Sequence, residues 1–96
     1  MPPLSQRTYV SVILRVSEAG VETPQAIILP DGRRYEVGTG TVHHRVKGGE
    51  ILTVHVGPAT THLYKDTSGW NGSRWFVVLR DVGDRPAFAP VEGESF

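Results

Sequence analysis

The sequence predicts an all-β fold, a small partly closed antiparallel β-barrel of six or seven short strands. Apolar residues alternate with other residues along most of the chain, helical periodicity is missing, and turn signals recur about every 10 residues. The chain has 96 residues, of which 39% are hydrophobic and 21% charged. This is enough for one domain with a single modest core. A barrel is favoured over a sandwich because closure removes exposed strand edges.

The first three expected strands lie in the N-terminal half of the chain. Residues 9–16 are rich in β-branched residues, and those at every second position share one face. Residues 25–29 and 34–37 then flank the turn PDGR, where Pro30 presets φ and Gly32 takes the positive-φ position. A hairpin is therefore expected over residues 25–37.

Four more strands are expected at residues 41–46, 51–56, 61–66 and 74–80. We read the intervening KGGE and GPAT segments as four-residue loops. The last strand is apolar on both faces, with Trp75 on the core side. This pattern indicates a central strand, or one that closes against a partner. A homodimer through an edge strand follows as a possible assembly.

The remaining segments are expected to lie outside the barrel domain of residues 9–80. Residues 1–8 are read as a flexible N-terminus, and residues 81–96 as an acidic, disordered tail. The net charge of the chain is zero because the mildly basic residues 1–80 are balanced by this acidic tail. The chain has no cysteine, no apolar leader and no membrane-length apolar run, which predicts a cytoplasmic protein without membrane association or cofactor.

Turn and core residues recur in a definite order along residues 9–79. They are Pro24, Ile27, Asp31-Gly32-Arg33, Tyr35, Val37, Gly48-Gly49, Leu63-Tyr64 and Arg74-Trp75-Phe76-Val77. This order resembles a family of small bacterial β-barrel proteins of unknown function, mostly from Gram-positive lineages. The resemblance is interrupted at Gly38-Thr39-Gly40, and it implies a compact β-barrel in a bacterial cytoplasm but no catalytic residues.

Three histidines form a candidate metal site if both loops have four residues. His55 would then lie directly opposite His62, and His44 would lie diagonal to His55 on the same face. Three neutral imidazoles are sufficient ligands for zinc or nickel with one open position. Solvated histidines are the competing interpretation, because no carboxylate is placed to orient the rings.

Two binding surfaces are open as alternatives for function. The first is a protein-binding face of His44, His55, His62 and Tyr64 together with Trp70, a tryptophan in a loop of small polar residues. The second is a basic face for single-stranded nucleic acid. Its candidate cations are Arg33, Arg34, Arg45, Lys47, Lys65 and Arg74.

Catalysis is not expected from this sequence. The acids lie mainly in turns, no histidine has an evident orienting acid, and a domain of this size has little room for a substrate cleft. The expected function is therefore a non-catalytic binding or interaction module with an unknown protein partner, and a nucleic-acid ligand or a histidine-bound metal are the alternatives.

Overall fold

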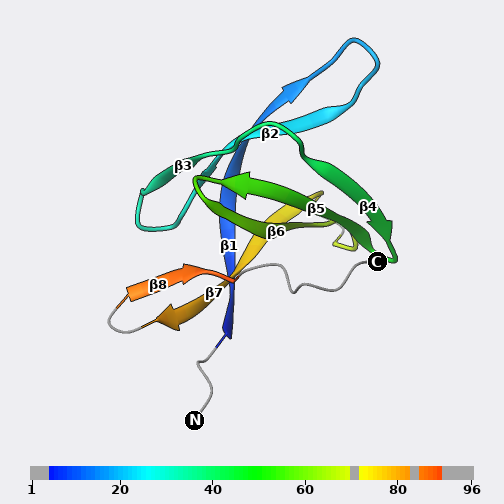
Figure 1. The fold of residues 1–96 in the computed structure, drawn as a ribbon. Coiled ribbons are helices and arrows are strands. Elements are labelled where there is room, and N and C mark those ends of the chain that lie inside the picture. The colour runs from blue at the N-terminus through cyan, green and yellow to red at the C-terminus, as the bar shows by residue number, and fades with distance from the viewer. Residues whose placement is uncertain (1–4, 70–71, 83–84, 90–96) are drawn as a thin grey trace.

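The computed structural model describes residues 5–69, 72–82 and 85–89, and it confirms the all-β class (Figure 1). These residues contain no helix, and so none that could cross a bilayer. The strands in chain order are β1 (Ser5–Val16), β2 (Glu22–Ile28), β3 (Arg34–Glu36), β4 (Val42–Val46), β5 (Gly49–Val56), β6 (Ala59–Asp66), β7 (Arg74–Val82) and β8 (Arg85–Phe88).

The strands form one antiparallel sheet in the order β3-β2-β1-β7-β6-β5-β4, and β8 pairs with β7 beside this path. No ladder within the described residues joins β3 to β4. The sheet is therefore strongly curved but open, and the expected closure into a barrel is not confirmed.

The ordered sheet extends beyond both ends of the domain predicted from sequence. β1 begins at Ser5 because residues 5–10 pair with residues 75–80 of β7. At the other end, β8 lies in the segment predicted as a disordered tail, and Phe88 pairs with Leu79 of β7. Both extensions depend on pairing with β7, which local sequence patterns do not report.

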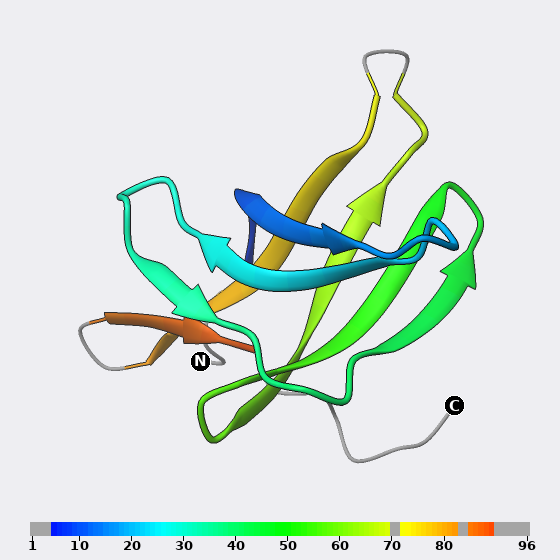
Figure 2. The same cartoon turned by 90° about the horizontal axis from the view of Figure 1, so that it is seen from above.

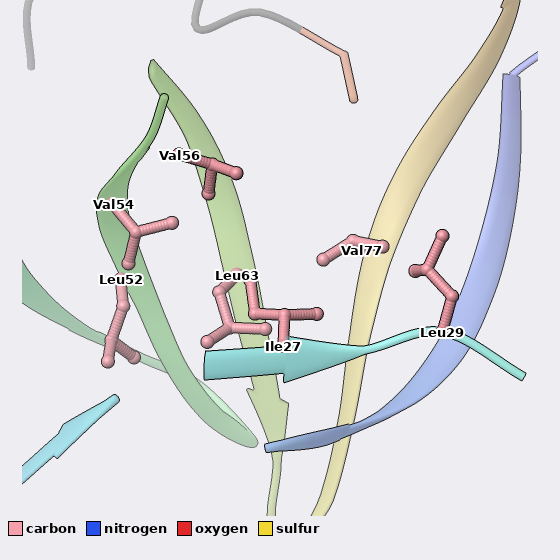
Figure 3. Packing of buried hydrophobic residues seen from close by; sticks show 7 residues of the cluster. All are labelled: Ile27, Leu29, Leu52, Val54, Val56, Leu63 and Val77. Carbon is pink, nitrogen blue, oxygen red and sulfur yellow. The ribbon is translucent and has the colours of Figure 1, made fainter. Parts of the chain in front are cut away.

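The core lies on one side of the sheet, which we call the inner face (Figure 3). Its side chains come from β2, β5, β6 and β7, together with Leu29, which follows β2. β2 crosses over β6 and β7, so its Ile27 side chain meets Leu63 of β6 and Val77 of β7 (Figures 2 and 3). Trp75 packs against this cluster, as its alternation with Val77 predicts. The fully or nearly buried members are Ile27, Leu29, Leu52, Val54, Val56, Leu63 and Val77.

β7 occupies the centre of the sheet, which explains why it is apolar on both faces. It pairs with β1 along one edge and with β6 and then β8 along the other. Because its backbone already has partners on both sides, the predicted homodimer through an edge strand would have to use a strand other than β7.

Candidate functional site: the outer-face cluster

The two hairpins that carry the histidines turn more tightly than predicted. Val46 pairs with Gly49 and Val56 pairs with Ala59, so each loop has two residues instead of four. Gly57 takes φ +59° immediately before Pro58, as the first central residue of a type II′ turn requires. Each register therefore differs by two residues from the expected one, which preserves the face of every side chain but changes its neighbours.

The predicted histidine triad does not form with this register. His62 lies opposite Thr53, whereas His55 lies opposite Thr60 and shares a hydrogen bond of 3.1 Å with its hydroxyl. The turn from β3 to β4 passes beside His55, where the ring packs close to Gly40. No group of three potential metal ligands occurs among the described residues. The three predicted ligands His44, His55 and His62 therefore do not come together as one group in this structure.

His44, His62 and Tyr64 remain on a common surface, opposite the core, which we call the outer face. His44 pairs with Ile51, and Ile51 pairs in turn with Tyr64. The His62 ring meets the Tyr64 ring edge to face at 5.9 Å. Partial burial, with added repulsion from His44, lowers the pKa of His62 below its ordinary value of 6.5.

An aromatic row continues from Tyr64 across the next two strands of the outer face. Tyr64 pairs with Phe76 of β7, and Phe76 pairs with Tyr9 of β1. The Tyr64 and Phe76 rings stack at 4.7 Å with an angle of 5° between their planes. Tyr9 meets Phe76 edge to face at 5.6 Å and is 36% exposed. Tyr64 and Phe76 are half-buried, so the row presents partly exposed rings on three adjacent strands.

Two arginines complete this surface. The Arg7 guanidinium lies 4.3 Å from the centre of the Phe76 ring, and the Arg74 guanidinium lies 3.8 Å from the centre of the Tyr9 ring. Stacking fixes the plane of a guanidinium while leaving its N–H groups directed outward. We call Arg7, Tyr9, Tyr64, Arg74 and Phe76 the outer-face cluster.

Neither arginine of the cluster is neutralised by an ion pair within the described residues. Asp66 is the acid that they influence. Hydrogen bonds from the Ser68 hydroxyl and backbone N–H lower the pKa of Asp66, and the positive charges of Arg7 and Arg74 lower it further. Asp66 is thus ionised, and it lies opposite Arg74 in the β6–β7 ladder, so it offsets part of the positive charge of the cluster.

A hollow of about 400 Å³ adjoins the cluster. Its apolar lining includes Ile51, Tyr64 and Phe76. Its charged lining consists of the cations Arg7, Lys47 and Lys65 and the acids Glu50 and Asp66. An apolar lining with a small excess of cations suits a ligand that combines a flat or apolar group with negative charge.

The six cations predicted for nucleic acid do not gather on one surface. Arg33 pairs with Asp31 at 2.7 Å and Arg34 with Glu36 at 2.5 Å, both near the β2–β3 turn. Lys65 pairs with Glu22 at 2.6 Å beside the core tryptophan. Arg45 points to the inner side of β4, as its pairing with Glu50 indicates. Only Arg74 belongs to the outer-face cluster, and Lys47 lines the hollow.

Sequence reasoning missed Arg7, Tyr9 and Phe76. The alternation pattern does place Tyr9 and Phe76 on the faces opposite the core, which is the only signal available. Their assembly depends on the pairing of β1 with β7, two strands at opposite ends of the chain.

The remaining predicted binding residue, Trp70, lies outside the described residues. No protein-family model, curated protein or solved structure matches this chain. The resemblance to a bacterial barrel family therefore stays a prediction, and function must be argued from the outer-face cluster itself.

Proposed function

We propose that the protein is a non-catalytic binding module that holds single-stranded nucleic acid on the outer face of its sheet. The observation that carries this proposal is the pair of stacked arginines, Arg7 and Arg74, beside an aromatic row. Within the part of the chain that the structure describes, neither arginine forms an ion pair. Guanidinium groups held in a plane are well suited to bind phosphate oxygens with two parallel hydrogen bonds.

The hollow beside the cluster favours a single strand over a duplex. Its lining of Ile51, Tyr64 and Phe76 can receive one base, which must first leave its stack. Bases of a single strand are already free to do so, and contact with aromatic side chains is a general way to bind them. In a duplex the flat surfaces of the bases are hidden, and only the phosphates would reach the arginines.

Charge sets the expected strength of this interaction. The chain has no net charge, and Asp66 offsets part of the positive charge of the cluster. We therefore expect two or three phosphate contacts, with log K falling by about 1.4–2 for each tenfold rise in salt. Binding of this kind is weak and is best observed at low salt.

The test is fluorescence anisotropy of a labelled oligothymidylate of about 15 nucleotides, at about 20 to 300 mM NaCl. The variant Arg7→Gln/Arg74→Gln should weaken binding about tenfold or more at the lowest salt and flatten the salt dependence. Arg33→Gln/Arg34→Gln is the matched control, because it removes the same charge from arginines that pair with acids. Its dissociation constant should change less than about threefold.

Two results would overturn the proposal. One is no binding of the oligonucleotide at the lowest salt, and the other is an equal loss in both double variants, which would indicate only a general effect of net charge. The surface would then be assigned to the second candidate, a protein partner. Tyrosine and arginine dominate the cluster and are enriched at the energetic centres of protein interfaces, which is the observation that favours this candidate.

A further inference from the structure

A second recognition feature lies at β4, which forms one end of the strand order while β3 forms the other. Among the described residues β4 pairs with β5 alone, so its other edge is open. Natural edge strands are usually protected by proline, bulges, irregular pairing or inward charges. Residues 42–46 have a regular ladder to β5 and contain no proline, and Val42 and Val46 are 49% and 42% exposed. Of these protections β4 has only the inward charge of Arg45.

The alternation of the ladder identifies the backbone groups at this edge. The Val46–Gly49 pair closes a two-residue turn and is therefore a hydrogen-bonded pair. Val46, His44 and Val42 then direct their backbone groups toward β5. The N–H and C=O groups of His43 and Arg45 point away from the sheet, where a further strand would meet them.

The sequence of β4 is close to a palindrome, Val-His-His-Arg-Val, centred on His44. We propose that the protein forms a symmetric dimer in which β4 pairs antiparallel with β4 of a second copy. With His44 on the twofold axis, His43 forms hydrogen-bonded pairs with Arg45 of the other copy, and Val42 lies opposite Val46. The same patch is then used twice, as twofold symmetry requires.

Side-chain chemistry fits a second copy on both faces of this joint. On the outer face the two exposed valines of each strand cover one another across the axis. On the inner face Arg45 lies opposite Glu50 in the ladder, and Glu50 lies 3.6 Å from the His43 ring. Each copy therefore places an acid directly across from Arg45 on the strand beside the joint.

The dimer should be weak, because five residues of added strand bury far less than a standard interface of about 1,600 Å². Sedimentation equilibrium from about 10 μM to about 1 mM protein should show a reversible monomer–dimer equilibrium. Arg45→Pro removes an N–H group that points outward without breaking the ladder to β5, so it should abolish the dimer. Arg45→Ala is the matched control: it removes the same side chain, keeps the N–H, and should still dimerise.

Circular dichroism checks that each variant is folded. If Arg45→Pro fails to fold, Val46→Lys gives a second test, because it places a charge against Val42 of the other copy and should weaken the dimer at least tenfold. A protein that stays monomeric at the highest concentration overturns the proposal. So does a dimer that survives both Arg45→Pro and Val46→Lys, since its interface must then lie elsewhere. None of these results depends on nucleic-acid binding.

Discussion

The two faces of this sheet are both apolar in part, but they differ in what covers them. On the inner face, aliphatic side chains such as Leu63 and Val77 are completely buried, because β2 crosses over them. On the outer face, Tyr9, Tyr64 and Phe76 contact each other and two arginines while remaining partly exposed. The inner face therefore stabilises the fold, whereas the outer face is the surface for which we propose binding.

The arginines repeat this contrast. Arg33 and Arg34 each reach an acid two residues away, so their charge is used locally at a turn. Arg7 and Arg74 instead stack on rings of neighbouring strands, and neither forms an ion pair among the residues that the structure describes. Arginine therefore forms a local ion pair where an acid is the nearest partner, and it stacks where an aromatic ring is nearest.

The largest effect is expected from truncating the inner face. Leu63→Ala leaves a cavity in the core and should lower the free energy of unfolding by about 2–5 kcal/mol. Urea denaturation measures this loss. A cost below about 1 kcal/mol would mean that the inner face relaxes around the missing side chain and is not the tightly packed core described above.

A backbone contact at the β4–β5 hairpin should give the next largest effect. A Cβ atom on Gly49 would overlap the carbonyl oxygen of Lys65, so Gly49→Ala must push β5 away from β6. We expect a loss of about 1–3 kcal/mol, typical of overpacking. Gly57→Ala serves as a comparison that meets no neighbouring atom but is strained by its positive φ. An unchanged midpoint for Gly49→Ala in urea would contradict the close approach of these strands.

On the outer face, Tyr64→Thr should cost only about 1 kcal/mol, because threonine suits a strand and mainly the ring contacts are lost. The same substitution should reduce the free energy of oligonucleotide binding by more than it reduces the free energy of unfolding. Denaturation and anisotropy on one protein sample separate the two effects. A stability loss equal to that of Leu63→Ala would show that the outer-face cluster is a second core instead of a binding surface.

The smallest effect concerns pH. The pKa of His62 is lower in the folded chain than its unfolded value of 6.5, so the unfolded chain binds a proton more readily. Stability contributed by neutral His62 is complete above pH 6.5 and is lost as the pH falls toward the folded pKa. Urea denaturation at several pH values should show this loss, and His62→Gln should reduce it. An identical pH dependence in the variant would assign the effect to other groups.

The histidine hairpins show how far sequence reasoning reached. It placed His44, His62 and Tyr64 on the face opposite the core, because strand alternation depends only on adjacent residues. It failed on their partners, because the number of loop residues sets the register and Gly57 allowed a tighter turn than assumed. The shift of two residues in register kept the histidines on the same face, but it moved His55 and His62 out of opposite positions, so the predicted group of ligands does not form.

The sequence alone determined the all-β class, the positions of most strands and the two-sided character of β7, since these depend on local alternation and turn residues. Only the tertiary structure decided that β1 pairs with β7, that the sheet stays open, and that Arg7 and Tyr9 join Phe76. The physical reason is that pairing between distant strands is chosen by the packing of the whole sheet against the entropy of closing a long loop, and no short segment contains that information.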